Sequence, residues 1–278
     1  MNKKIRIGAL ISGGGSNLKA IIRSCESGKT DGKVIFAGSD NPNARGLEML
    51  RKHNIPCFVV DYASIIQAYK KEPEKIKPPD DFDIDDVLSK QSLFPKDADP
   101  EKVKAFFTTR AVAEARILEQ IKSYPFDLLV LAGFMRTVTP YFIDRVNTEP
   151  LNPRIMNIHP ALLPMFPGID GYGDTFRYGC KVGGCTVHFI DYGEDSGPIV
   201  GQKAFQILDN DTIETVKKKG LQLEWELYSE CVRLFAKGHL KTVRMIYNMK
   251  NGRQEHRTIV KINKDKGNGH AQGWHPSA

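Results

Sequence analysis

The segment NIHP, residues 157–160, places an amide and an imidazole two residues apart, directly after the apolar pair Ile155-Met156. Alternate side chains of an extended segment project to the same side, so Asn157 and His159 would face one space at the end of a strand. An amide can donate a hydrogen bond to a developing oxyanion, and an imidazole can carry a proton. The pattern indicates either an active site or a histidine satisfied by backbone at an ordinary strand exit.

A polar loop, DYGEDSGPI at residues 191–199, contains carboxylates that could support such an imidazole. Asp195 precedes Ser-Gly-Pro and is therefore held in a turn, from which it could orient and stabilise an imidazolium if it reaches His159. Asp191 and Glu194 are rivals for this role. Spacing alone does not choose among them, and a hairpin turn with solvated acids is the alternative.

A glycine-rich turn, ISGGGSN at residues 11–17, joins a predicted strand to a predicted helix. Its three glycines allow close approach of the backbone, while Ser16 and Asn17 can cap the helix and offer donors where its dipole favours an anion. The turn would suit a phosphate, but it matches neither the dinucleotide fingerprint nor the lysine-containing phosphate loop. A turn that only joins strand and helix is equally consistent.

The stretch LAGFMRTVTPYF, residues 131–142, ends a predicted strand at Ala132-Gly133. The short connection 135–138 follows, and Thr139-Pro140 has the residue types of a helix N-cap and first helical position. Backbone groups of such a connection can hydrogen-bond a flat heterocycle. The other interpretation is an ordinary loop that only connects the strand to the helix.

These polar groups need a scaffold, and apolar runs rich in β-branched residues alternate along the chain with amphipathic segments. The predicted strands are 5–11, 34–37, 57–60, 127–132, 154–158, 185–190 and 198–207. The predicted helices include 17–25, 44–53, 112–123 and a long helix 211–236, capped by Asp209 or Asp211. We therefore predict an α/β, Rossmann-like three-layer fold: a mostly parallel central sheet of about seven strands with helices on both faces. Ligands then belong at the carboxyl ends of the strands.

Two segments interrupt the alternation. Residues 62–108 contain five prolines and the acidic run DDFDIDD, which predicts an insertion with one short helix outside the core sheet. The acids lack the glycine and distal glutamate of a calcium loop, so we expect a solvated face. We assign 1–240 to the main domain and 241–278 to a basic C-terminal extension, with a hairpin and a loose end.

Composition narrows the class of protein. The chain has 278 residues, 41% of them hydrophobic, and no apolar run near the ~20 residues of a membrane span. Five cysteines without CxxC spacing predict neither disulfides nor a zinc site, and the start lacks a cleavage site, so we expect a cytoplasmic protein. Residues 241–278 hold eight Lys/Arg against two Asp/Glu, an excess of six within the net charge of +7. Nucleic-acid binding is therefore not expected.

Taken together and in this order, the motifs ISGGGSN, LAGFMRTVTPYFID, NIHPALLPMFPG and GCTVHFIDYGEDSGPIV resemble the phosphoribosylglycinamide formyltransferase family. The resemblance covers roughly residues 5–60 and 105–237. It implies transfer of a formyl group from 10-formyltetrahydrofolate to the amine of glycinamide ribonucleotide in purine synthesis. It also implies small-molecule substrates, no metal and no membrane, and we expect a monomer or homodimer.

The resemblance carries over to residues at matching positions. It implies a catalytic trio of Asn157, His159 and Asp195. The phosphate of the ribonucleotide would lie at Gly15, Ser16 and Asn17. Glu224 of the long helix would bind the other end of the ribonucleotide. The folate would be bound by Met135, Arg136, Thr137, Val138, Asp191, Tyr192, Gly193 and Glu194, and Arg110 would be a further folate contact.

The chain also departs from the family. Where family members commonly carry His-x-His after a proline-glycine pair, this chain has Asp170 and Tyr172, and Gly171 and Gly173 put the start of a helix there in doubt. The insertion could cover the folate side. Three alternatives stay open. The first is hydrolysis of formyl-folate, which the glycine turn and a first strand starting at Ile5 disfavour. The others are formyl transfer to an amino sugar or aminoacyl-tRNA, and a catalytically silent folate- or nucleotide-binding protein.

Overall fold

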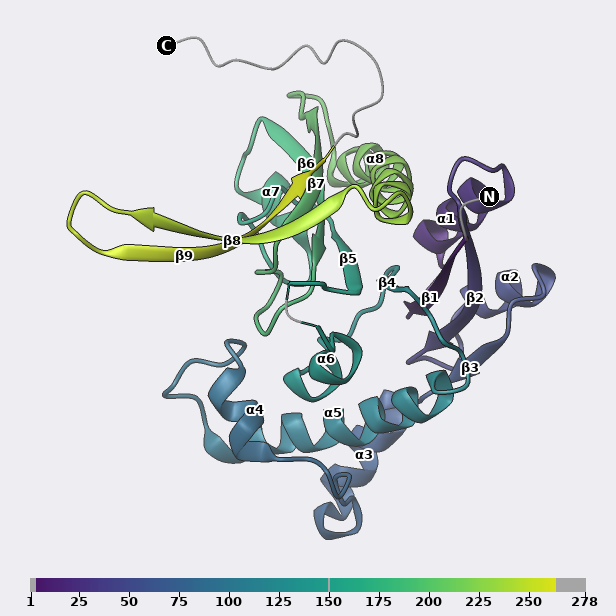
Figure 1. Cartoon of the computed structure of the whole chain (residues 1–278), viewed down its shortest axis with the longest axis vertical. Coiled ribbons are helices and arrows are strands. Elements are labelled where there is room, and N and C mark those ends of the chain that lie inside the picture. Colours follow the sequence, from purple (N-terminus) through teal and green to yellow (C-terminus); the bar gives the residue numbers. More distant parts are fainter. Residues whose placement is uncertain (1–3, 150, 264–278) are drawn as a thin grey trace.

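A seven-stranded sheet forms the centre of the computed structural model, which describes residues 4–149 and 151–263 (Figure 1). Its order is β3-β2-β1-β4-β5-β6-β7. The strands are β1 (Ile5–Ile11), β2 (Gly32–Ser39), β3 (Cys57–Val59), β4 (Leu128–Leu131), β5 (Ile155–His159), β6 (Val182–Phe189) and β7 (Ile199–Gln206). The strands from β3 to β5 pair in parallel, whereas β6 and β7 pair antiparallel. The predicted α/β fold with a mostly parallel sheet is confirmed.

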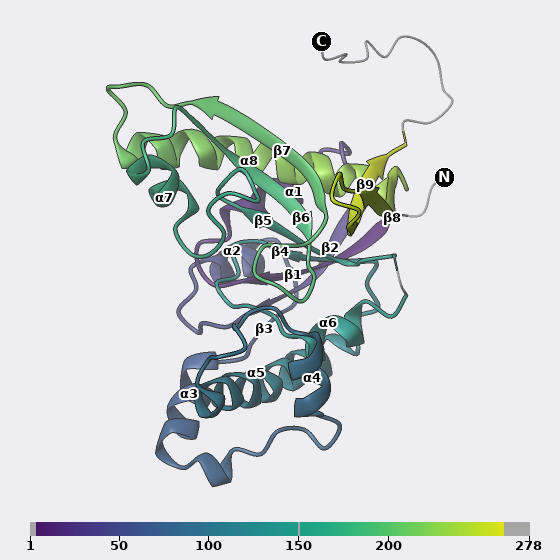
Figure 2. The same cartoon turned by 90° about the vertical axis from the view of Figure 1, so that its left-hand side faces the viewer.

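Helices cover both faces of this sheet, which explains the continuous apolar runs of strands such as β4, whose four residues are all buried. One face packs against α1 (Ser16–Glu26), α2 (Gly46–Lys52) and α8 (Ile213–Ala236). The other face packs against α3 (Tyr62–Lys71), α5 (Pro100–Ile121) and α6 (Pro140–Val146). Figures 1 and 2 show the two helical layers on opposite sides of the sheet.

The insertion is more helical than the sequence predicted. Besides α3 and the first half of α5 it contains a 3-10 turn, Pro73–Lys75, and α4 (Ile84–Lys90). The prediction of one short helix was wrong because the prolines were read only as breakers. Asp61, Asp83 and Asp99 each cap a helix, accepting backbone N–H bonds, and Pro100 occupies the first turn of α5.

Two predicted caps are also corrected. The first residue before α1 is Gly15, in the left-handed region at φ 68°, and neither Ser16 nor Asn17 caps the helix with its side chain. The long helix α8 starts with a capping box at Thr212 rather than a cap from Asp209 or Asp211. Thr139 and Pro140 do occupy the predicted N-cap and first-turn positions of α6.

The predicted C-terminal hairpin is present as β8 (Leu240–Asn248) and β9 (Gln254–Ile262), paired antiparallel and projecting from the body (Figure 1). Leu240 and Val260 at its base pack against the core next to α8. The predicted loose end, from 264 onward, lies outside the described residues. None of the helices that the structure describes has the length and apolar character to cross a membrane.

Candidate active site

Asn157 and His159 lie at the carboxyl end of β5, where they line a cavity of about 290 Å³. The connection 135–138 after β4 lines another side of it, as do Asn17 at the start of α1 and Glu224 of α8. Five segments that are distant in sequence therefore meet at the edge of the sheet, since Gly193, Glu194 and Asp195 complete the wall. This is the edge at which ligands of parallel α/β sheets bind.

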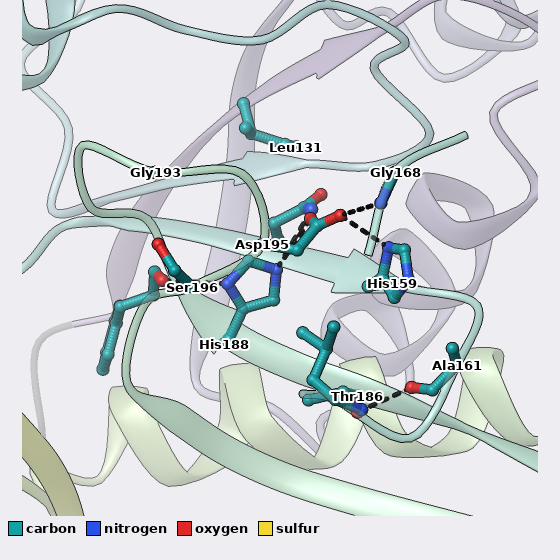
Figure 3. A network of polar contacts seen from close by, with 12 residues as sticks. Leu131, His159, Ala161, Gly168, Thr186, His188, Gly193, Asp195 and Ser196 are labelled. Atoms are coloured by element: carbon teal, nitrogen blue, oxygen red, sulfur yellow. Dashed lines mark hydrogen bonds and ion pairs between the residues drawn. The ribbon is translucent and has the colours of Figure 1, made fainter. Parts of the chain in front are cut away.

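Asp195 reaches His159, as the spacing of the motifs allowed but did not require. The imidazole Nδ1 lies 3.0 Å from Asp195 Oδ2, and the same oxygen accepts a 2.9 Å bond from the backbone N–H of Gly168 (Figure 3). On its other side, the imidazole Nε2 lies 2.8 Å from the carbonyl oxygen of Phe166. Both ring nitrogens face acceptors, which favours a ring that carries two hydrogens and a positive charge.

The electrostatics agree with that protonation state. Burial by itself lowers the pKa of His159, but the hydrogen bond and charge of Asp195, helped by the Phe166 carbonyl, leave this pKa above its ordinary value. Burial raises the pKa of Asp195, yet its bonds to His159 and His188 outweigh this and hold that pKa well below the usual range. Geometry and electrostatics therefore both favour a buried imidazolium paired with the Asp195 carboxylate.

His188 of β6 is a member of this site that sequence reasoning missed. It lies directly opposite Asn157 in the antiparallel pairing of β5 with β6 and is fully buried. Its Nδ1 lies 3.0 Å from the Phe189 carbonyl oxygen, and its Nε2 lies 3.3 Å from Asn157 Nδ2 and 3.5 Å from Asp195 Oδ1. Figure 3 shows the Asp195 carboxylate between the two imidazoles. The strand register alone brings His188 here, and the sequence carries no direct sign of it.

The exit of β5 is held by a neighbouring polar contact. The Thr186 hydroxyl of β6 donates to the Ala161 carbonyl at 2.7 Å and accepts from the Leu163 N–H at 3.0 Å (Figure 3). Because Thr186 pairs opposite His159 in the sheet, the backbone just after the catalytic strand has a defined course. The wall of the cavity next to His159 is thereby fixed.

On the opposite side of the cavity, Asn17 and Glu224 form a direct pair. Asn17 Nδ2 donates to Glu224 Oε2 at 2.7 Å, and both residues are more than nine-tenths buried. The amide oxygen of Asn17 is buried without a partner. Burial raises the pKa of Glu224, while bonds from Asn17 and Tyr172 oppose that rise. An unpaired acceptor beside a carboxylate favours a ligand that brings hydrogen-bond donors.

The connection 135–138 is tied to the glycine turn. Ser12 Oγ accepts a 2.7 Å bond from the Met135 N–H, and the Ser12 N–H donates to the Gly133 carbonyl at 3.0 Å. Ser12 immediately precedes the glycines. The turn that could hold a phosphate and the connection that could hold a heterocycle are thus mechanically joined.

Two buried carboxyl groups hold the same connection in place. Arg136 Nε donates to Asp40 Oδ2 at 2.5 Å, and Asp40 is buried. Glu114 of α5, which is fully buried, accepts bonds from the Thr139 N–H at 2.8 Å and the Thr139 hydroxyl at 2.5 Å. Burial raises the pKa of Glu114 to about 8, although the bonds from Thr139 oppose the shift. Neither carboxylate was identified from the sequence.

Arg110 is not brought to the cavity. Its guanidinium lies over the rings of Tyr62 and Phe106, at 5.3 and 4.6 Å from their centroids, and the residue is 9% exposed. The side chain would have to leave these aromatic contacts to touch a ligand in the cavity. Its role as a folate contact stays a prediction.

Asp191 and Tyr192 also lie outside the cavity lining. Asp191 organises its own loop, accepting bonds from the Gly193 N–H and the Ser196 hydroxyl, so it does not compete with Asp195. The Tyr192 hydroxyl donates to Asp144, and the Tyr192 carbonyl accepts from the N–H of Ser92 at 3.0 Å. Ser92 belongs to the insertion, which therefore contacts the loop on the expected folate side.

A larger hollow of about 950 Å³ lies elsewhere, between α1 and α8. Ser16 lines it, but no member of the trio does, and its walls are mainly charged and polar surface side chains. The smaller cavity is the better candidate site because it alone of the two contains the buried imidazolium and the partially satisfied Asn17. Gly15 lines neither hollow and is buried beside α2.

Comparisons with known proteins identify the family of this chain. A model of the formyl transferase family matches residues 5–232. The chain is 31% identical to the phosphoribosylglycinamide formyltransferase of Bacillus subtilis over 222 residues, which are 80% of this chain and 90% of that protein. It is 29% identical to the trifunctional purine biosynthetic protein adenosine-3 of Chironomus tentans, spanning 86% of this chain but 14% of that longer protein.

Among solved structures, glycinamide ribonucleotide transformylase 1 from Symbiobacterium toebii matches with a TM-score of 0.68 and 32% identity. The match covers 94% of this chain and 95% of that chain. The phosphoribosylglycinamide formyltransferase of Bacillus halodurans matches with a TM-score of 0.62 and 30% identity, over 83% of this chain and 94% of that one. With its family model, its relatives and its fold in agreement, the chain belongs to the formyl transferase family.

Proposed function

We propose that this protein transfers the formyl group of 10-formyltetrahydrofolate to the amine of glycinamide ribonucleotide, a step of purine biosynthesis. The observation that carries the proposal is one cavity in which the His159–Asp195 pair, the connection 135–138 and the Asn17–Glu224 pair all converge. The relatives named phosphoribosylglycinamide formyltransferase support the choice of both substrates.

The trio supplies what the reaction needs. The amine attacks the formyl carbon, and the carbonyl electrons move onto oxygen to give a tetrahedral intermediate with a negative charge. The Asn157 amide nitrogen lies 3.3 Å from Nε2 of His188, and an N–H of this amide can donate to that oxygen. His159, charged beside Asp195, stabilises the same oxygen. As the bond from carbon to N10 of the folate breaks, His159 donates a proton to N10, and the proton that the attacking ammonium loses restores the protonated imidazole, so the transfer involves no net gain or loss of protons.

One contact in the ligand-free structure must yield for this step. Nδ1 of His159 is committed to Asp195, and Nε2 bonds the carbonyl of Phe166. A proton from Nε2 reaches the substrate only if the substrate displaces that carbonyl. Phe166 has φ 54°, a left-handed conformation that is unfavourable for residues other than glycine. The backbone that presents this carbonyl is therefore strained.

The two substrates have distinct walls. We assign the phosphate of the ribonucleotide to the backbone at Gly15, Ser16 and Asn17, because α1 begins there without a side-chain cap and the N–H groups and dipole of a helix start favour an anion. The side-chain amide of Asn17 is bonded to Glu224 instead. The amine end then lies toward Glu224 and His159. The folate heterocycle lies against Met135, Arg136, Thr137 and Val138, with Gly193 and Glu194 opposite. The expected cytoplasmic location and the oligomeric state stay predictions.

Absorbance of the folate tests the proposal, because loss of the formyl group changes its spectrum. The protein is mixed with 10-formyltetrahydrofolate with and without glycinamide ribonucleotide. We expect deformylation only when both substrates are present. Deformylation at the same rate without the ribonucleotide would instead identify a hydrolase, and no deformylation with either mixture would exclude both activities.

A further inference from the structure

Tyr172 does not line the cavity but hydrogen-bonds Glu224, which does. It belongs to the short helix α7 (Gly171–Arg177), which packs against α8, and it is 6% exposed. The Tyr172 hydroxyl donates to Glu224 Oε1 at 2.8 Å, while Asn17 Nδ2 donates to Oε2 at 2.7 Å. Each oxygen of this carboxylate is therefore held by one neutral donor. Tyr172 itself does not line the cavity.

The chain makes room for this ring in an unusual way. Gly220 lies one turn before Glu224 on α8, and a Cβ built on it would come within 2.1 Å of Tyr172 Cζ. Glycine inside a helix costs about 0.5–1 kcal/mol relative to alanine. The tyrosine ring therefore packs directly against the backbone of Gly220, in space that any side chain there would fill. Tyr172 packs on Gly220 and hydrogen-bonds Glu224, and of these three residues Glu224 is the one that lines the cavity.

The start of α7 is fixed by a similar close contact. A Cβ on Gly171 would lie 2.7 Å from the carbonyl oxygen of Pro160, the residue after His159. Gly171, one of the two glycines that made a helix doubtful in the sequence, therefore allows α7 to pack directly against the end of β5. Asp170, the other departure from the family, points to Lys217 and Arg177 at 3.1 and 2.9 Å.

The phenol suits its task electrostatically. Burial, followed by the charge of Glu224, raises the pKa of Tyr172 far above its usual range, so the hydroxyl remains a neutral donor. A donor at this position favours the ionised form of Glu224 against the opposing effect of burial. A carboxylate oxygen has more than one acceptor direction, so each can bond a buried donor and still accept from a ligand.

We infer that Tyr172 is a positioning residue for the ribonucleotide, which holds the Glu224 carboxylate ionised and oriented to accept hydrogen bonds from amine or hydroxyl groups of that substrate. The inference rests on the proposed function. It assigns Tyr172 to the ribonucleotide alone, since its hydroxyl bonds Glu224, which the proposed function gives to that substrate, and Tyr172 has no part in the connection 135–138. Loss of the hydroxyl therefore weakens one substrate and spares the other.

The variant Tyr172→Phe keeps the ring and removes the hydroxyl. We expect KM for the ribonucleotide to rise about tenfold or more, because a hydrogen bond to a charged group is lost. KM for the folate and kcat should stay within about twofold, a split that a loosened fold would not produce. Tyr247→Phe, at an exposed residue of β8, is the matched control and should leave all constants unchanged.

Two further variants keep the test decisive if Tyr172→Phe folds poorly. Gly220→Ala retains the hydroxyl but pushes the ring, so it should raise the same KM. Adding Tyr172→Phe to Glu224→Gln should cost little beyond Glu224→Gln alone, because both act through one carboxylate. Fully additive effects, or an equal rise of KM for both substrates, would overturn the inference.

Wild-type transfer is measured first in the same assay. An active wild type with an unchanged ribonucleotide KM in Tyr172→Phe overturns the role of Tyr172 and leaves the proposed function intact. An inactive wild type overturns the proposed function, and the role of Tyr172 falls with it.

Discussion

Replacement of Asp195 by asparagine tests how the site keeps His159 charged. The two side chains are 3.0 Å apart and only 13% and 3% exposed, so solvent screens their interaction weakly. Opposite charges about 4 Å apart interact by roughly 4 kcal/mol at an effective dielectric constant near 20. One pKa unit corresponds to about 1.4 kcal/mol, so losing the carboxylate charge should lower the pKa of His159 by about one to three units.

The pH dependence of kcat/KM reports this change. In the proposed mechanism His159 acts in its protonated form, so activity should fall as pH rises through its pKa, which lies above the ordinary value in the wild type. In Asp195→Asn, the Phe166 carbonyl and Glu224 still oppose the effect of burial, but the hydrogen bond and charge of the carboxylate are gone, so the falling limb should move to lower pH. At pH 7.5 a two-unit shift removes up to about 100-fold of the protonated form and of the rate.

The control is Asp209→Asn, which removes a carboxylate paired with Lys181 at an exposed position. Its pH profile should match the wild type. Urea unfolding of both variants separates loss of fold from loss of charge. An unchanged falling limb in a folded Asp195→Asn variant would refute the idea that Asp195 sets the protonation of His159.

The remaining predictions concern the ribonucleotide side and the buried support of the connection 135–138. Asn17→Ala removes the donor to Glu224 and the unpaired amide oxygen, so calorimetric titration should show weaker binding of ribonucleotide than of folate relative to wild type; equal weakening of both would contradict the assignment. Glu114→Gln should flatten the pH dependence of stability. The carboxyl has a pKa of about 8 in the folded protein against an ordinary value of 4.5, so its contribution is complete below about pH 4.5 and is lost as pH rises through 8. The full shift is worth roughly 5 kcal/mol at most, and parallel urea-midpoint curves for wild type and variant between pH 5 and 8.5 would count against it.

The central scaffold was accessible from the sequence because its strands are continuous apolar runs. Parallel strands covered on both faces, such as Leu128–Leu131, are buried on both sides and therefore appear in the sequence as uninterrupted apolar runs. The antiparallel direction of β6 and β7 was not accessible, because apolar patterning is the same in either direction. The insertion was misjudged since Asp99-Pro100 starts a helix as readily as it ends one.

The site was predictable where chemistry and position coincide, and otherwise not. Asn157 and His159 end a strand, so their common direction follows from strand geometry. Asp195 rather than Asp191 pairs with His159 because Asp191 accepts hydrogen bonds from its own loop. The sequence does not show which of the two carboxylates bonds within the loop. His188 and Glu114 act through tertiary register and burial, which no local pattern encodes. Arg110 was placed by homologous spacing, while its aromatic neighbours decide where its side chain lies.

Carbon-13 NMR with a labelled formyl group tests the central claim most directly. The label is placed on 10-formyltetrahydrofolate, and wild type and His159→Ala are compared with ribonucleotide present. The account predicts that the wild type moves the label onto the ribonucleotide amine without free formate, and that His159→Ala, still folded, does so at least about 100-fold more slowly. Label appearing in formate, or an undiminished rate in the variant, would contradict it.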